Sequence, residues 1–239
     1  MEQHLYSPEE LTLVPEVALN LSRGCGNPTG FANLLPGALV VDFGCGGGID
    51  VILAAHKVGL EGRVIGIDFS PQMIERAKQA VDQANLPDRN IELLVAEMGS
   101  TQLPENCADV VISNCVINLI PDKDAVYQEA FRILKPGGGL AISDIVLTEQ
   151  LDPSLQEHFR SIWSGCLGGA IPENDYFQTV MNAGFSGIQV AARHQLSQAE
   201  LTAMARCPGE EFTPAPDPND LAAVEGKVTS IKFRAFKPA

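Results

Sequence analysis

The chain has 239 residues and a formal net charge of −14 at pH 7, a length that can bury one α/β core, alone or with a smaller appendage. Such an acidic chain offers no basic surface to a nucleic-acid backbone or an anionic membrane, and no apolar run reaches the roughly 18 to 20 residues of a bilayer span. We therefore expect a soluble protein that binds neither nucleic acid nor membrane. Residues 1–16 lack the chemistry of a signal or transit peptide, so we expect a reducing, cytoplasmic location.

Six cysteines are scattered along the chain, at Cys25, Cys45, Cys107, Cys115, Cys166 and Cys207. They form no CxxC pair and no Cys/His cluster with ligand spacing, which argues against a structural zinc site. An even number of cysteines suggests disulfides in a small secreted protein, but we expect this chain to be neither small nor secreted. Any role that these thiols share must therefore be assembled by the fold.

From residue 39 onward, short β-branched runs alternate with helical patterns, which is typical of a parallel sheet wrapped by helices. Strands are predicted at residues 39–43, 64–67, 91–95, 110–113 and 140–145. Helices are predicted at 71–84 and 122–134, and the proline and glycines of 135–139 are expected to stop the second helix and turn the chain into the next strand. The pattern indicates a doubly wound, mostly parallel sheet.

The pattern changes after residue 145. Helices are predicted at 153–165 and 173–183, and a third helix begins at the capping box formed by Ser197 and Glu200. The prolines and acids between residues 207 and 220 predict an ordered loop. The alternating stretch at 227–236 predicts a final strand.

A glycine-rich loop follows the first strand, in the stretch from Asp42 to Gly48, and the second strand ends in Asp68 about 20 residues on. Glycines permit a tight turn and a close approach of ligand to backbone, and a carboxylate at that strand end hydrogen-bonds ribose hydroxyls in nucleotide-binding folds. NAD is the alternative ligand, but Asp42 would repel its pyrophosphate, whereas a cationic sulfonium suits an acidic mouth. With the LKPGG stretch at 134–138, residues 35–145 resemble class I S-adenosylmethionine methyltransferases.

That resemblance implies an α/β, Rossmann-like fold with S-adenosyl-L-methionine as methyl donor and a small C-terminal extension that carries substrate-binding loops. It places Asp68 on the ribose, Phe69 on the adenine, and Glu97 and Met98 at the adenine edge. The implied cofactor-binding residues are Asp42, Gly44, Cys45, Gly46, Asp68, Phe69, Met73, Glu97, Met98 and Asn114.

Further stretches are similar to the arsenite methyltransferase family: SNCVINLIPDK at 113–123, SDIV at 143–146, RGCGNP at 23–28, WSGCLGGA at 163–170 and CPGEEF at 207–212. This resemblance spans almost the whole chain, and it implies that Cys25, Cys166 and Cys207 are the catalytic residues that bind arsenic. It gives Cys115 a packing role near the site and Cys107 none. Many members carry additional cysteines before the first of these thiols, whereas residues 1–24 contain none.

The implied activity is methyl transfer from S-adenosylmethionine to thiolate-bound arsenite or methylarsenite, which yields methylated arsenicals and detoxifies arsenic. Trivalent arsenic prefers thiolates and keeps a lone pair that can attack a methyl carbon, so the reaction needs orientation rather than a general base. A thiol reductant such as thioredoxin or glutathione is the expected co-substrate.

Three regions are expected: an N-terminal helical segment and substrate loop at 1–36, an S-adenosylmethionine-binding domain at 37–147, and a C-terminal arsenic-binding region with the final strands at 148–239.

Two other functions remain open. A quinone-biosynthesis-type C-methyltransferase would share the glycine loop but need neither Cys25 nor Cys166. A non-catalytic metalloid-binding protein could keep the same fold, because fold alone does not establish activity.

Overall fold

A computed structural model describes residues 5–19, 24–86, 91–162, 167–205 and 218–239. Its described strands form one seven-stranded sheet in the order β3-β2-β1-β4-β5-β7-β6, with β7 antiparallel to both of its neighbours. The strands are β1 (Leu39–Phe43), β2 (Arg63–Asp68), β3 (Ile91–Val95), β4 (Ala108–Asn114), β5 (Leu134–Leu147), β6 (Ser186–Gln195) and β7 (Val228–Phe236). The doubly wound, mostly parallel sheet expected from the sequence is confirmed.

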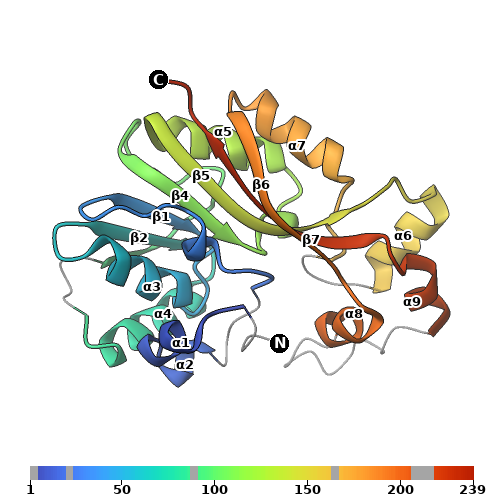
Figure 1. The fold of residues 1–239 in the computed structure, drawn as a ribbon, viewed down its shortest axis with the longest axis horizontal. Helices are drawn as coiled ribbons and strands as arrows, with labels where there is room; N and C mark the ends of the chain where they lie inside the picture. Colours follow the sequence, from blue (N-terminus) through green and yellow to red (C-terminus); the bar gives the residue numbers. More distant parts are fainter. Residues whose placement is uncertain (1–4, 20–23, 87–90, 163–166, 206–217) are drawn as a thin grey trace.

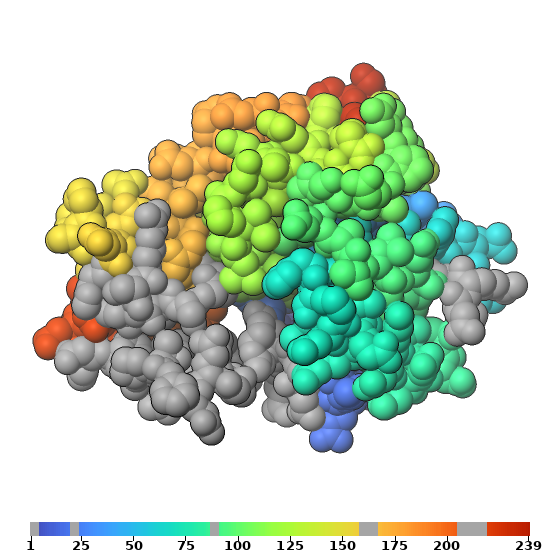
Figure 2. Space-filling model, turned by 180° about the vertical axis from the view of Figure 1, so that it is seen from behind, coloured from blue at the N-terminus to red at the C-terminus, as the bar shows by residue number. Residues whose placement is uncertain are grey.

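Helices cover both faces of the sheet (Figure 1). α3 (Ile49–Val58) and α4 (Pro71–Gln83) pack on one face, and α5 (Lys123–Ile133) and α7 (Glu173–Asn182) pack on the other. The yellow-green region of α5 and the orange region of α7 are both visible in Figure 2. Successive strand residues alternate between the two cores, as Val40 and Val41 do. Each is fully buried, which stabilises the fold by about 1.5–3 kcal/mol per side chain.

Among the described residues, no helix has the length and apolar character to cross a membrane.

A third apolar cluster lies where β5 ends and β7 begins. The helices α6 (Pro153–Ile162), α8 (Gln198–Ala205) and α9 (Pro218–Val224) lie in the same part of the molecule (Figure 1). The cluster contains Leu147, Leu201 and Val228, together with Cys115 from the end of β4. Cys25 packs against it. This cluster is therefore the place where the N-terminal and C-terminal parts of the chain meet the sheet.

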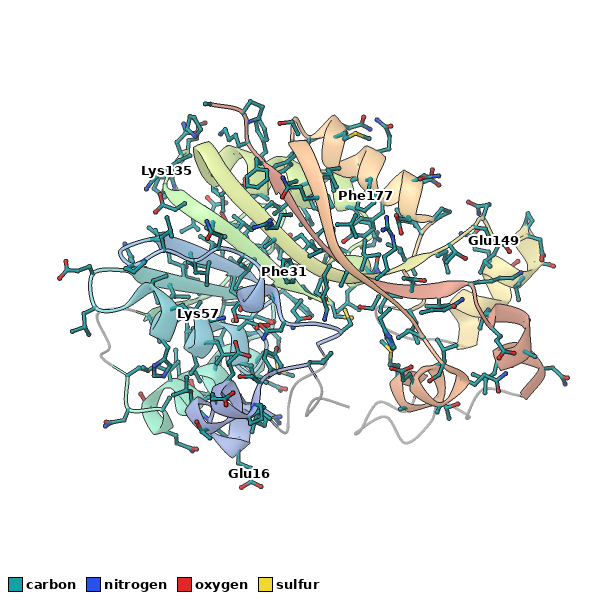
Figure 3. The ribbon with its side chains drawn as sticks, viewed as in Figure 1. Glu16, Phe31, Lys57, Lys135, Glu149 and Phe177 are labelled. Carbon is teal, nitrogen blue, oxygen red and sulfur yellow. The ribbon has the colours of Figure 1, made fainter. Side chains whose placement is uncertain are left out.

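The N-terminal segment is held against α3 by Lys57, which is labelled in Figure 3. The Lys57 ammonium donates to the Thr29 carbonyl at 2.8 Å and lies 3.1 Å from a Glu10 carboxylate oxygen. Glu10 belongs to α1 (Pro8–Leu13), which Ser7 caps, and Thr29 belongs to η2 (Pro28–Gly30); the short α2 (Glu16–Leu19) lies between them in sequence. Residues 24–28, called here the Cys25 loop, are thus anchored from both sides.

Three sequence predictions differ from the structure. β5 begins at Leu134, directly after α5, and runs through 135–139 with Gly137 at φ 78°, so this stretch belongs to the strand rather than to a separate turn. β6 was not predicted, because it is an edge strand that pairs with β7 alone and is mostly exposed, so it has little apolar periodicity. The loop predicted between 207 and 220 ends earlier, because α9 begins at Pro218; its other residues lie outside the described part of the chain.

Candidate functional site

A cavity of about 320 Å³ lies at the carboxyl ends of β1, β2 and β4. We call it the glycine-loop pocket, and it is lined by Tyr6, Ala18, Gly24, Asp42, Gly44, Cys45, Gly46, Gly47, Ile49, Asp50, Asp68, Phe69, Ser70, Met73, Asn114, Cys115, Val116 and Leu119. This is the position at which open α/β sheets bind ligands. The volume is within the range of small-molecule sites.

The loop between β1 and α3 folds back on β2. The backbone N–H groups of Gly44 and Cys45 both donate to the Ile67 carbonyl, at 2.8 and 2.9 Å. Gly44 has φ 72°, and a Cβ there would lie 2.5 Å from Val116 Cγ1. A side chain at position 44 would therefore be strained and would collide with a pocket wall.

Asp68 braces this loop. Its Oδ2 accepts from the Gly46 N–H at 3.0 Å, and its Oδ1 accepts from the Ser70 N–H at 2.9 Å. The carboxylate therefore fixes both the glycine loop and the start of α4 while it lines the pocket.

Two more buried carboxyls line the pocket, at Asp42 and Asp50. Burial, reinforced by the charges of Asp50 and Asp68, raises the pKa of Asp42 well above its usual range. Burial also raises the pKa of Asp50 to about 6, against hydrogen bonds from Asn114 and Tyr6 that favour its ionised form. With three carboxyls, the pocket favours a cationic ligand over an anionic one.

Eight of the ten predicted cofactor-binding residues line this pocket; Glu97 and Met98 do not. Phe69 is 60% exposed at the rim, where its ring is accessible to a flat ligand. Glu97 is exposed and pairs with Ser100 through an isolated bridge, whereas Met98 is buried in the core on the side of α5. The assignment of these two residues to the adenine edge stays a prediction.

The Cys25 loop lies against the same pocket. Cys25 and Gly26 donate their backbone N–H groups to Asn114 Oδ1 at 3.1 and 3.2 Å, and Ser230 donates its hydroxyl to the Cys25 carbonyl at 2.9 Å. The Cys25 sulfur lies 3.7 Å from the Ser143 hydroxyl oxygen. Three neighbouring strands, β4, β5 and β7, therefore position this thiol.

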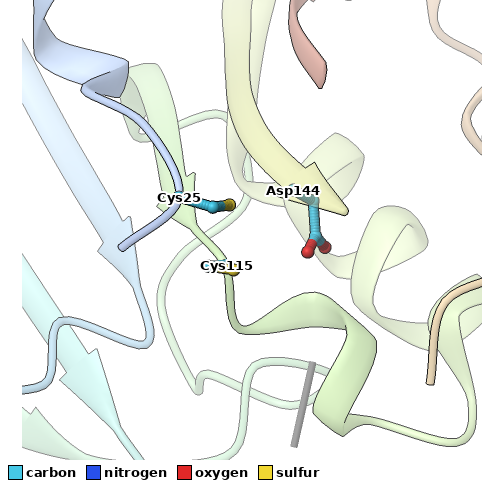
Figure 4. Close-up of side chains that lie close together, drawn as sticks. All are labelled: Cys25, Cys115 and Asp144. Carbon is cyan, nitrogen blue, oxygen red and sulfur yellow. The ribbon is translucent and has the colours of Figure 1, made fainter. Parts of the chain in front are cut away.

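Cys25, Cys115 and Asp144 come together at one point, as Figure 4 shows, with one ligand atom of each within 4.8 Å of the others. Cys115 is 6% exposed and has φ 60°, a left-handed conformation that is rare outside glycine and asparagine. Its N–H donates to the Ser143 carbonyl at 2.8 Å, which ties this strained turn to β5. The backbone conformation at residue 115 thus brings a second thiol beside Cys25.

Asp144 is fully buried and belongs to a chain of polar groups. Tyr176 donates to its Oδ2 at 2.8 Å and accepts from the Tyr127 hydroxyl at 2.8 Å, while Asn118 donates to its Oδ1 at 3.0 Å. Burial raises the pKa of Asp144 to about 6, although hydrogen bonds from the Ile145 N–H and Tyr176 oppose the shift.

The other cysteines differ in environment. Burial, followed by the charges of Asp42 and Asp68, raises the pKa of the Cys45 thiol well above its usual range, so this thiol stays protonated beside the pocket. Burial also raises the pKa of Cys107. The predicted arsenic ligands Cys166 and Cys207 lie outside the described residues.

Sequence reasoning missed two residues of this site, Tyr6 and Asp50. The Tyr6 hydroxyl donates to the Asp50 carboxylate, and Asn114 Nδ2 donates to the same carboxylate at 2.9 Å. Asp50 lies two residues after the glycine-rich stretch and could have been recognised as an acid in the first turn of α3. No local signal marked Tyr6, because its partner is 44 residues away in sequence.

The sheet order, the glycine loop after β1 and the acid at the end of β2 define a class I methyltransferase. Residues 34–202 match the family model described as a methyltransferase domain, and the chain belongs to that family.

Several relatives carry more specific names. The chain is 38% identical over 193 residues to the arsenite methyltransferase of Halobacterium salinarum, which covers 81% of this chain and 48% of the relative. It is 36% identical over 108 residues to the demethylmenaquinone methyltransferase of Listeria welshimeri, which covers 45% of each chain. The crystal structure of an arsenic(III) S-adenosylmethionine methyltransferase from Chlamydomonas reinhardtii superposes with a TM-score of 0.81 at 30% identity and covers 96% of this chain and 73% of that one. The chain spans about half the length of the curated relatives that it matches.

Proposed function

We propose that this protein transfers a methyl group from S-adenosylmethionine to trivalent arsenic bound by cysteine thiolates. The observation that carries the proposal is the place of Cys25, because the loop that holds this thiol also forms a wall of the glycine-loop pocket through Gly24. The methyl donor in the pocket and the arsenic bound at Cys25 would then be neighbours. The likeness to arsenite methyltransferases over 81% of the chain supports the same substrate, whereas the quinone-type relative matches 45%.

The residues of the pocket fit S-adenosylmethionine as donor. The three carboxyls of Asp42, Asp50 and Asp68 suit its cationic groups, and a Cβ at Gly46 would meet no atom within 4 Å, so the backbone there is open to a ligand. When bound, the donor supplies an electrophilic methyl group on a sulfonium. The exposed ring of Phe69 at the rim supports the predicted contact with adenine.

For the acceptor, we propose Cys25 as one thiolate ligand, with Cys166 and Cys207 as the others implied by the family resemblance. Three thiols displace three oxygens of arsenite as water, and the arsenic lone pair then forms the As–C bond while the S–C bond of the sulfonium breaks. Arsenic thereby gives up two electrons, and a thiol reductant such as thioredoxin or glutathione would return them. The Cys25 loop and its three strand contacts supply orientation, which can remove about 7–11 kcal/mol of barrier in well-aligned reactions.

Two further parts of the proposal concern the setting of the reaction. Because arsenic binding needs reduced thiols, we place the reaction in a reducing, cytoplasmic compartment. The region from residue 148 onward would contribute the remaining arsenic-binding loops to the domain at 37–147, and its strands β6 and β7 join the same sheet.

The test is incubation of the purified protein with arsenite, S-adenosylmethionine and a thiol reductant, followed by chromatographic separation of arsenic species with elemental detection. We expect methylated arsenicals together with one equivalent of S-adenosylhomocysteine for each methyl group transferred. A parallel reaction with demethylmenaquinone in place of arsenite tests the quinone-type alternative. Donor binding without methylated arsenic would overturn the proposal and leave a metalloid-binding or quinone-type role.

A further inference from the structure

The wall between the glycine-loop pocket and the Cys25 thiol is built from the N-terminal segment and the end of β4. Tyr6, Gly24 and Asn114 all line the pocket, and Gly24 directly precedes Cys25. A Cβ at Gly24 would lie 2.5 Å from Asn114 Nδ2, so backbone and amide are packed as closely as a glycine allows. A ligand that fills the pocket therefore touches the group that holds the thiol.

The side chain of Asn114 is bonded to both sides of this wall. On the acceptor side, its Oδ1 accepts from the N–H groups of Cys25 and Gly26, and its Nδ2 donates to the Gly26 carbonyl at 2.8 Å. On the pocket side, Nδ2 donates to Asp50 at 2.9 Å and to the Tyr6 hydroxyl at 3.2 Å. These contacts use both lone pairs of the amide oxygen, and the two amide hydrogens are shared among three acceptors. The amide therefore cannot move on one side without changing bonds on the other.

We propose that Asn114 is a positioning residue through which occupancy of the glycine-loop pocket and the reactivity of the Cys25 thiol control one another. This inference rests on the proposed function, in which the pocket holds the methyl donor and Cys25 holds the acceptor. It assigns Asn114 a role beyond the cofactor contact implied by family resemblance. Because such coupling is reciprocal, arsenic bound at Cys25 must change donor affinity by the same factor that the donor changes arsenic affinity.

Ser230 provides a matched contrast. It donates to the Cys25 carbonyl from β7, which β5 separates from the strand of Asn114, and it does not line the pocket. Removal of its hydroxyl loosens the same loop but leaves every bond of Asn114 in place. A variant at Ser230 therefore separates a general loosening of the loop from a loss of communication with the pocket.

The experiment measures the rate at which iodoacetamide alkylates Cys25, located by fragment mass spectrometry, with and without saturating S-adenosylhomocysteine. In the unmodified protein, the filled pocket should slow alkylation by about fivefold or more, the lower range of typical coupling between sites. In Asn114→Ala, the ratio of the two rates should fall to within about twofold of one, at a ligand concentration that saturates this variant. In Ser230→Ala, both rates should rise and their ratio should stay as in the unmodified protein.

Three results would overturn the inference: no effect of S-adenosylhomocysteine on Cys25 in the unmodified protein, the same ratio in Asn114→Ala, or an equal collapse of the ratio in Ser230→Ala. Should circular dichroism show that Asn114→Ala does not fold, Tyr6→Phe decides, because it removes one bond of the pocket side and should reduce the ratio. An unchanged ratio in Tyr6→Phe would then contradict the inference. None of these measurements requires arsenic, so failure of arsenite methylation would leave the coupling testable.

Discussion

The phenolic oxygen of Tyr6 lies 3.2 Å from a carboxylate oxygen of Asp50, and this bond joins the N-terminal segment to the first turn of α3. Both groups are buried, and burial raises the pKa of Tyr6 well above its usual range and that of Asp50 to about 6. The hydroxyl therefore stays protonated as a donor, while the carboxyl changes its charge just below neutral pH.

Donor affinity should depend on pH through this carboxyl and Asp42. Both have raised pKa values in the empty pocket, so both hold protons at low pH and lose them as the pH rises, Asp50 near pH 6. A cation favours the ionised forms, so S-adenosylmethionine should bind more weakly at pH 5 than at pH 8, by about tenfold for one such carboxyl. Calorimetry at the two pH values measures this. S-adenosylhomocysteine lacks the sulfonium charge and should show a smaller change; an equal change for both ligands would contradict the assignment.

Asp68→Ala should weaken S-adenosylmethionine binding by about tenfold or more. The substitution leaves the Gly46 and Ser70 N–H groups without their acceptor and removes the carboxylate from the pocket, and a lost buried bond of this kind costs about 1–3 kcal/mol. Calorimetric titration checks the affinity. Asp82→Ala, which removes an exposed acid from α4, is the matched control and should bind normally. Equal affinity of Asp68→Ala and the unmodified protein would remove Asp68 from the site.

Gly26→Ala should displace the Cys25 thiol. A Cβ at position 26 would lie 2.1 Å from the Ser143 hydroxyl oxygen and 2.8 Å from Lys232 Cε, so the loop must shift. A shift of about 1 Å can cost about 10²-fold in rate, and we expect a loss of that size in arsenite methylation. Gly139→Ala is the control, because a Cβ there meets no atom within 4 Å. Similar rates for both variants would show that the loop position does not limit the reaction.

Cys25→Ser should lose the first methylation and largely keep the second. Arsenite can take three thiolates, whereas monomethylarsenite has one position occupied by carbon and can take only two, which Cys166 and Cys207 would supply. A serine hydroxyl stays protonated and is a poor ligand for a soft centre. Each substrate is given separately, and methylated products are quantified. Cys166→Ser is the comparison and should lose both steps. Retained arsenite methylation by Cys25→Ser would exclude Cys25 as a ligand.

Tyr176→Phe should destabilise the fold more than Tyr127→Phe. The Tyr176 hydroxyl donates to buried Asp144 and accepts from Tyr127, so its removal leaves both partners incomplete and should lower the free energy of unfolding by about 1–3 kcal/mol. Tyr127→Phe removes one donor and leaves the bond to Asp144, and should cost about 0.5–1.5 kcal/mol. Chemical denaturation of both variants measures the difference. The reverse order would show that Asp144 is not held through Tyr176.

Local sequence determined the elements whose signals are local. The strands at 39–43 and 91–95 were predicted with their observed bounds, because short β-branched runs between turn residues mark buried parallel strands. The glycine loop and Asp68 were recognisable for the same reason, since the bonds that shape the loop join residues at most 23 positions apart. The edge strand β6 was not predicted, because it buries little and pairs with β7, more than 30 residues further along the chain.

Tertiary structure alone decided what surrounds Cys25. Its partners Asn114 and Ser230 lie 89 and 205 residues away, and no pattern in one segment of sequence encodes a contact with several strands at once. The approach of Cys115 depends on a left-handed backbone at a non-glycine residue, held by a bond to β5. The sequence by itself thus determined which thiol and which carboxylates were present. The packing of β4, β5 and β7 decided which of them meet, because only the assembled sheet brings these strands side by side.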